Sequence, residues 1–326
     1  MGVPRFEPFP ALRYRTHNST DIGVLSAPPY DVFDEDRRQQ YAQSHAHNVV
    51  HVDYPIESDG PQRYDNAARV LHEWISNGVL ARDTTASFSI YRMTFTDDAG
   101  RPRTTIGVIG ALEVVDEGAG GVLPHERTTP KAKTDRLDLT RATQANLSPV
   151  WGLSLSKGLT ELLMEPGEVV AECTDEDGVH HVIERVDDPG RVHAIGERVS
   201  ASPVLIADGH HRYAISRTYR DEVRSAGGPV GAELTMTYVG ELIQEQLSVA
   251  AIHRLYDLTA ATLLSALRPY YSATDAGKVD THTIAQMDEK GCLCLVDAEG
   301  NGTFLTPDES ALSSIRNLDS SRLEFA

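Results

Sequence analysis

Five consecutive residues at positions 208–212, Asp-Gly-His-His-Arg, carry the side chains with the clearest chemical potential in the sequence. The apolar residues 204–207 before them predict a buried strand, and residues 213–225 predict a helix. At the start of a helix, several backbone N–H groups have no partner within the helix, and together with the helix dipole they favour an anion such as phosphate. Gly209 has no Cβ and lets the backbone approach a ligand closely, while Arg212 offers a bidentate fork to phosphate oxygens. The pattern therefore predicts a phosphate-binding turn.

The other three residues of this turn extend the chemistry beyond phosphate binding. His210 and His211 can donate hydrogen bonds to a ligand or carry a proton near neutral pH. Asp208 would repel an anion unless it holds a divalent ion or takes a proton from a substrate hydroxyl group, so it is a candidate metal ligand and catalytic base. The alternative is that Asp208 caps the helix and that both histidines are partly exposed surface residues.

A second reactive group occupies positions 125–128, His-Glu-Arg-Thr, after a glycine-rich loop. Glu126 is a candidate general base or metal ligand, and His125 is a second proton carrier. Arg127 and Thr128 are candidates for binding the anionic part of a cofactor. Between positions 125 and 141, five basic side chains oppose three acidic ones, which would attract an anion. A solvated loop with ordinary ion pairs explains the same pattern equally well.

A third candidate for catalysis, Asp31, follows two prolines at positions 28 and 29. Prolines restrict the backbone, so they would hold this carboxylate still for a reaction. A simple turn that leads into a helix starting near Asp34 is an equally good explanation.

The turn at 208–212 resembles the signature turn of the ParB/sulfiredoxin-like superfamily, which places a Gly-x-x-Arg turn on nucleotide phosphates. Within that superfamily the free serine kinases have a very similar Asp-Gly-His-His-Arg turn. The chain as a whole resembles a family of bacterial proteins of unknown function, domain-of-unknown-function family one thousand and fifteen. The segments that carry this second resemblance are APPYDV at 27–32, HNVVHVDYP at 47–55, PHERT at 124–128, ANLSPVWGL at 145–153 and ADGHHRY at 207–213.

The first resemblance implies ATP or ADP with Mg²⁺ as cofactor. A sulfiredoxin-type reaction would need a cysteine within the turn, and the turn here contains none. Members of the second family carry a later Lys-Ser-Thr-Tyr-Phe stretch that this sequence lacks, so a site completed by that stretch would be altered.

The composition restricts the classes of partner. The 326 residues carry a formal net charge of −18, which repels nucleic acid and disfavours a DNA-binding role on the ParB pattern. We find no signal peptide and no apolar run long enough to cross a membrane. The three scattered cysteines favour a reducing compartment. We therefore expect a soluble cytoplasmic protein that binds neither nucleic acid nor membranes, and its oligomeric state is left open.

Periodicity predicts an α/β (α+β) protein with a mixed sheet and β-hairpin insertions. The resemblance of the turn at 208–212 implies that its core is ParB/sulfiredoxin-like. The predicted domains are a phosphate-binding or nucleotide-binding domain at 1–248, with a β-rich insertion at about 87–200, and a smaller C-terminal α/β subdomain at 249–326. The predicted helices cover residues 34–44, 63–78, 134–146, 213–225 and 263–271. The predicted strands include 9–15, 49–54, 148–154, 204–207 and 234–239, hairpins at 87–115 and 292–305, and a meander at 168–199.

The leading hypothesis is a phosphotransferase that uses a nucleotide and Mg²⁺ to phosphorylate a small hydroxylated metabolite such as serine. In such an enzyme Arg212 and the imidazoles would face the negative charge, and Glu126, Asp208 or Asp31 would take the hydroxyl proton. Two alternatives are a phosphatase of phosphoserine-like substrates and a non-catalytic nucleotide-binding regulatory module. The sequence contains no P-loop, dinucleotide-binding, zinc-protease or serine-hydrolase motif.

Overall fold

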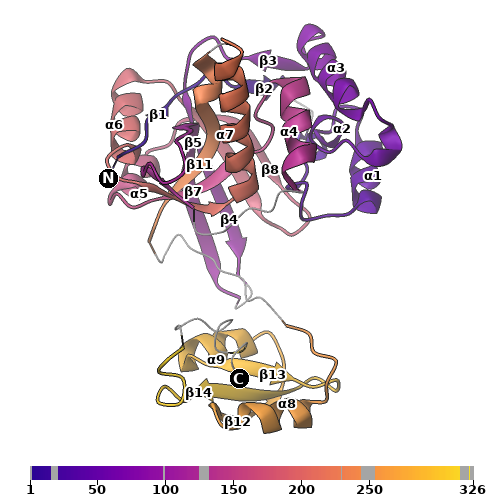
Figure 1. Ribbon diagram of the computed structural model, residues 1–326, viewed down its shortest axis with the longest axis vertical. Coiled ribbons are helices and arrows are strands. Elements are labelled where there is room, and N and C mark those ends of the chain that lie inside the picture. Colours follow the sequence, from indigo (N-terminus) through magenta and orange to yellow (C-terminus); the bar gives the residue numbers. More distant parts are fainter. Residues whose placement is uncertain are drawn as a thin grey trace. The chain divides into compact units, whose positions relative to one another are not determined.

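The computed structural model describes residues 2–15, 21–97, 100–124, 132–228, 230–243, 254–315 and 323, with the backbone alone at 132–134 and 230. The chain forms two compact units (Figure 1). Unit 1 comprises residues 1–95 and 104–247, and unit 2 comprises residues 96–103 and 248–326.

Unit 1 is built around a mixed sheet, which confirms the predicted α+β class. The order of its described strands is β6-β10-β7-β11-β5-β4-β9-β8, with β1 paired to β5. Strand β10 runs parallel to β6 and antiparallel to β7, whereas β7 runs parallel to β11. The strands are β1 (Phe6–Glu7), β4 (Phe88–Thr96), β5 (Pro102–Glu113), β6 (Val122–Leu123), β7 (Val150–Ser154), β8 (Glu168–Thr174), β9 (His180–Val186), β10 (Val204–Asp208) and β11 (Leu234–Glu241).

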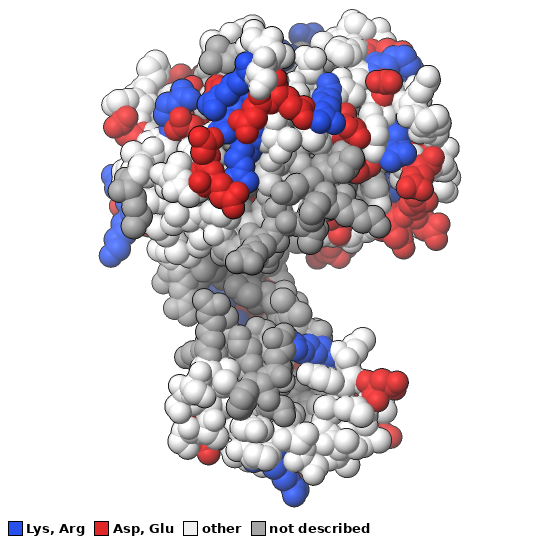
Figure 2. Space-filling view, viewed as in Figure 1, with Lys and Arg blue, Asp and Glu red and all other residues white. Residues whose placement is uncertain are grey.

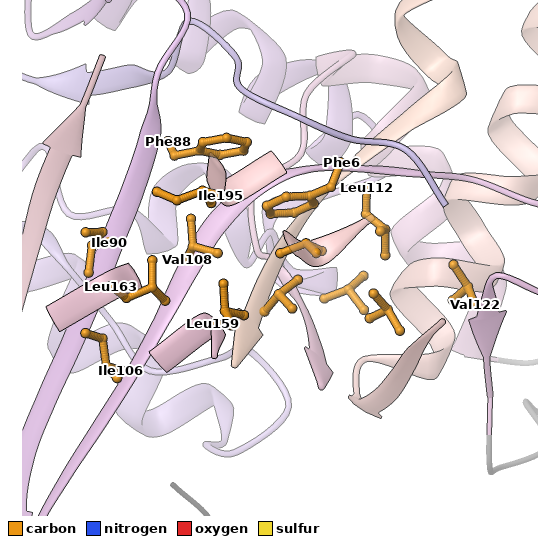
Figure 3. Packing of buried hydrophobic residues seen from close by; sticks show 14 of the residues in the cluster. Phe6, Phe88, Ile90, Ile106, Val108, Leu112, Val122, Leu159, Leu163 and Ile195 are labelled. Carbon is orange, nitrogen blue, oxygen red and sulfur yellow. The ribbon is translucent and has the colours of Figure 1, made fainter. Parts of the chain in front are cut away.

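One face of this sheet carries the main hydrophobic core. Alternate residues of the strands point to the same face, so Phe88 and Ile90 of β4 meet Val108 of β5 and the helices above them. The covering helices are α5 (Leu159–Met164), α6 (Pro189–Val199) and α7 (His210–Ser225). Figure 3 shows the labelled side chains of these strands and helices gathered in one layer, where Phe6 stacks on Phe88 with ring centroids 5.1 Å apart.

Two further helices extend the helical layer beside α7. Helix α4 (Ala132–Thr143) packs between α3 (Arg63–Ser76) and α7 (Figure 1). A second small core lies under α3, where Trp74 and Leu71 pack on Val52. The elements near this core are β2 (Leu12–Tyr14), η1 (Ile22–Leu25), α1 (Glu35–Ser44), α2 (Val50–Asp53), η2 (Glu57–Asp59) and β3 (Leu80–Arg82), and η3 (Val230–Glu233) precedes β11.

Unit 2 has its own sheet and core. Its strand order is β12-β14-β13, and buried Leu267, Tyr271 and Leu305 form the centre of its core. The strands β13 and β14 form the hairpin that the sequence predicts. The elements are α8 (Ala260–Leu267), β12 (Tyr271–Lys278), α9 (Thr283–Lys290), β13 (Leu293–Val296) and β14 (Asn301–Pro307). No helix among the described residues of either unit is long and apolar enough to cross a membrane.

Two predicted elements are wrong. The predicted strand at 49–54 is the short helix α2, because the Asn48 side chain accepts a bond from the Val50 amide and donates to the carbonyls of Val24 and Ser26, at the end of η1. The predicted meander at 168–199 is a hairpin followed by helix α6. Asp188 caps this helix and Pro189 occupies its first turn, a start signal that the weak alternation before it obscured.

Tyr213 ties α7 to the end of β5. Its hydroxyl group donates a hydrogen bond to the Glu113 carbonyl over 3.0 Å and accepts one from the Val115 amide over 2.9 Å. The ring is 5% exposed, and burial raises the pKa of Tyr213 to about 12. The neutral phenol is therefore part of the fold.

We expect Tyr213→Phe to lower the free energy of unfolding by about 1–3 kcal/mol at neutral pH, because the Val115 amide loses its acceptor. The folded pKa lies above the unfolded value of about 10, so this contribution is complete below pH 10 and is lost as the pH rises towards about 12. Urea unfolding between pH 7 and 12 would measure both effects. Tyr219→Phe, on the same helix, is the control, and equal losses for the two variants would contradict the assignment.

Candidate functional site

The turn between β10 and α7 has a backbone that requires glycine. β10 ends at Asp208, α7 begins at His210, and Gly209 between them has φ +83° and ψ 29°. A Cβ on Gly209 would lie 3.1 Å from both Cζ and Nε of Arg212 and 3.4 Å from the Val150 Cα. Other side chains are therefore disfavoured there by both conformation and space.

Arg212 closes this turn against the neighbouring strand. Its Nη2 donates to Asp208 Oδ2 over 2.5 Å, and its Nη1 donates to the carbonyl of Pro149, which precedes β7. The Arg212 side chain is 13% exposed, whereas that of Asp208 is 60% exposed. The guanidinium is thus held beside the helix N-terminus, and the carboxylate at its edge faces solvent.

The two histidines of the turn lie in different surroundings. His210 is 6% exposed, whereas His211 is half-buried. Both belong to the first turn of α7, so the helix starts three residues earlier than the sequence predicts. The sequence treats the two imidazoles as equivalent, and the structure leaves His211 the more accessible of the pair.

A buried ion pair lies in the same region. Nη1 of Arg136, on α4, donates to Asp53 Oδ1 over 3.1 Å, and Ser148 donates to Asp53 Oδ2 over 3.2 Å. The side chains of Arg136 and Asp53 are 9% and 12% exposed. Asp53 ends α2, so this pair connects α2, α4 and the segment before β7.

Tyr30 joins this ion pair to the turn. The Arg136 guanidinium lies over the Tyr30 ring, 3.2 Å from its centroid. Burial raises the pKa of Tyr30, and the charges of Arg136 and Arg212 both act against that rise, while Asp31 and Asp53 add to it. Four segments that are far apart in the sequence, near residues 30, 53, 148 and 210, therefore converge. Helix α4, which carries Arg136, is the fifth element of this cluster.

Of the remaining predicted site residues, the structure describes Asp31 and Asp208. Residues 125–128, with His125, Glu126, Arg127 and Thr128, lie outside the described residues. Asp31 is exposed at the edge of the cluster. Asp208 is described, but no group of three or more His, Cys, Asp or Glu suited to a metal ion occurs among the described residues.

The basic side chains of α4 that the structure describes are paired with acidic side chains. Arg136 pairs with Asp53, and Arg141 pairs with both Asp138 and Glu222. Figure 2 shows the result over α4 and α7, where basic and acidic side chains are interleaved. Two surface hollows, of about 610 and 330 Å³, lie elsewhere, beside α6 and between α3 and α4.

The Asp53–Arg136 pair was not predicted from the sequence. Asp53 lies within the segment 49–54, which the sequence predicts as a strand, and Arg136 is one of five basic residues between positions 125 and 141. The available signal was that a single aspartate follows the apolar residues Val49, Val50 and Val52. A charge within such a run needs a partner when it is buried.

Gly209→Ala is expected to lower the free energy of unfolding by about 1–3 kcal/mol, because alanine is strained at positive φ and its Cβ would displace Arg212. Urea unfolding measures this change. The control is Gly231→Ala, since Gly231 has no positive φ and a Cβ there would meet nothing within 4 Å. Equal stability of the two variants would show that the turn does not depend on glycine.

Arg136→Ala is expected to destabilise the protein by about 3–5 kcal/mol, because Asp53 would be left as an unpaired buried charge. The matched control is Arg69→Ala, which removes an exposed pair with Glu73 on α3 and should cost no more than about 1 kcal/mol. Thermal and urea unfolding of both variants provide the comparison. A loss for Arg136→Ala no larger than the control would rule out a structural role for the buried pair.

Comparison with curated proteins and with solved structures finds no match. A family model does match, and it covers residues 6–321, which is nearly the whole chain. The segments that converge around Tyr30 and Arg212 all lie within the matched range. The chain therefore belongs to the family described as "Protein of unknown function (DUF1015)".

Proposed function

We propose that unit 1 is a nucleotide-dependent phosphotransferase that binds ATP or ADP with Mg²⁺ and phosphorylates a small hydroxylated metabolite of the serine type. The observation that carries this proposal is the turn at Gly209, where a left-handed glycine opens the N-terminus of a 16-residue helix and Arg212 is held beside it. A helix N-terminus with a glycine approach and a fixed guanidinium is suited to phosphate oxygens. The likeness of this turn to that of the free serine kinases supports the same function.

The charges around the turn also suit a nucleotide with its metal ion. Arg136 and Arg212 provide two positive charges, and Asp31, Asp53 and Asp208 provide three negative ones. Mg²⁺ is usually held by one or two carboxylates together with the phosphates of the substrate. A dedicated cluster of three protein ligands is therefore not required, and the exposed carboxylate of Asp208 is suited to one metal contact.

The reaction would need positioning and charge neutralisation more than covalent chemistry. The substrate hydroxyl oxygen would attack the terminal phosphorus, the bond from phosphorus to the nucleotide oxygen would break, and a carboxylate would take the hydroxyl proton. Asp208, Asp31 and Glu126 are the candidate bases, with His125 and His211 as further proton carriers. Gly209, His210, His211 and Arg212 would hold the phosphates, with Arg127 and Thr128 as further ligands.

Arg212→Ala is expected to weaken the binding of ADP with Mg²⁺ by about 10-fold to 100-fold, because charge-assisted hydrogen bonds contribute about 1.5–3 kcal/mol each. Calorimetric titration measures the affinity. Arg224→Ala is the matched control, because Arg224 lies at the other end of α7 with its side chain 51% exposed and paired to Glu233. Arg212→Lys should give an intermediate value, since it keeps the charge and loses the fork.

The proposal fails if the unchanged protein binds neither ADP nor inorganic phosphate with Mg²⁺ present, or if the two arginine-to-alanine variants bind ADP equally well. Measurements of turnover distinguish the kinase from the phosphatase and from the regulatory module. Nucleotide-dependent formation of phosphoserine supports the kinase, and release of phosphate from phosphoserine without nucleotide supports a phosphatase. Tight nucleotide binding with no turnover supports a regulatory module.

A further inference from the structure

Trp151 is a large aromatic side chain that remains accessible in the interior of the sheet. It lies on β7, between β10 and β11, and is 37% exposed. Its neighbour Val150 points into the main core and is 1% exposed. Because successive side chains of a strand alternate, Trp151 lies on the opposite face of the sheet.

The strand pairing places Trp151 next to the proposed phosphate site. Its partner on β10 is Asp208, and its partner on β11 is Tyr238. The register of β10 shifts between Ile206 and Asp208, so the pairing brings the backbones of Asp208 and Trp151 together without placing their side chains on one face. Arg212 also bonds to the carbonyl of Pro149, two residues before Trp151. The start of β7, which carries Trp151, therefore lies beside the turn at Gly209.

The position of the indole ring is supported from one side by other aromatic rings. The Tyr238 ring lies 6.4 Å from that of Trp151 and is itself 7% exposed. Tyr91 contacts Tyr238 edge-on at 5.6 Å. Gly107 makes room for Tyr238, because a Cβ there would lie 2.3 Å from its Cε2. Trp151 is the most exposed of these three rings and lies at the end of the row nearer to β10.

We infer that Trp151 is the stacking surface for the base of the nucleotide, and this inference rests on the proposed function. Adjacent strands are about 4.8 Å apart, so a base on the indole ring would leave its ribose and phosphates close to Gly209. Stacking on an aromatic side chain accepts any base, since every base has a π-face. The site would then take a nucleoside phosphate and bind pyrophosphate less tightly.

The intrinsic fluorescence of the full chain provides the test. The chain has two tryptophans, and Trp74 is 6% exposed in the core under α3, so Trp74→Phe leaves Trp151 as the reporter. ADP, pyrophosphate and adenosine are each titrated with Mg²⁺ present. We expect ADP to quench the emission saturably and to bind more tightly than pyrophosphate.

Trp151→Ala, measured by calorimetry, should weaken ADP binding by about 10-fold and leave pyrophosphate binding within about 2-fold. Trp151→Phe should recover most of the ADP affinity, and it also tests whether the alanine variant is merely misfolded. Leu155→Ala is the matched control, because Leu155 follows β7 and is 44% exposed. It should not alter ADP binding.

The outcomes separate the two proposals. Unchanged ADP affinity in Trp151→Ala, or an equal loss for ADP and pyrophosphate, overturns the stacking role even if the phosphate site is real. Binding of adenosine with quenching but no binding of pyrophosphate supports the stacking surface and removes the phosphate site at the turn. Failure of all three probes overturns both.

Discussion

The left-handed backbone of Gly209 allows β10 to pass directly into α7, and the Arg212 guanidinium closes the same turn against the segment before β7. Both features need the same small volume, since any Cβ would meet Arg212. The pairing of β10 with β7 then brings Trp151 beside Asp208. The accessible groups of the candidate site thus follow from one conformational constraint and from the strand register next to it.

The buried pair of Asp53 and Arg136 has a different role from the turn. Well-packed apolar residues often replace buried ion pairs without loss of stability, so stability alone does not require the pair. What the pair provides is one defined position of α4 relative to Tyr30 and Ser148. Helix α4 also packs on α7, which carries the turn. The glycine turn therefore fixes the start of α7, and the buried ion pair fixes the neighbouring helix α4.

The sequence correctly predicts the helices and strands that carry strong local signals, such as a capping residue or a regular apolar period. Helix α1 begins after its cap Asp34, close to the predicted start, α3 lies within the predicted helix 63–78, and the strand before the turn ends at Asp208. The failures arose where tertiary contacts outweigh local preference. Residues 50–53 are rich in valine, yet the side chain of Asn48 and the packing of Val52 hold them in a helix. Helix α6 was not predicted, because the weakly alternating residues of the hairpin before it were extended to position 199.

The sequence by itself determined the mixed α+β class, the family and the turn at Gly209, because glycine, capping residues and periodic apolar residues act over a few positions. Only the tertiary structure decided that Tyr30, Asp53, Arg136 and Ser148 converge on this turn, and that His210 is buried while Trp151 is accessible. The physical reason is that strand register and helix packing join residues far apart in the sequence, as in the bonds that Arg212, Arg136 and Ser148 make across 63, 83 and 95 positions. No local pattern records such long-range pairings.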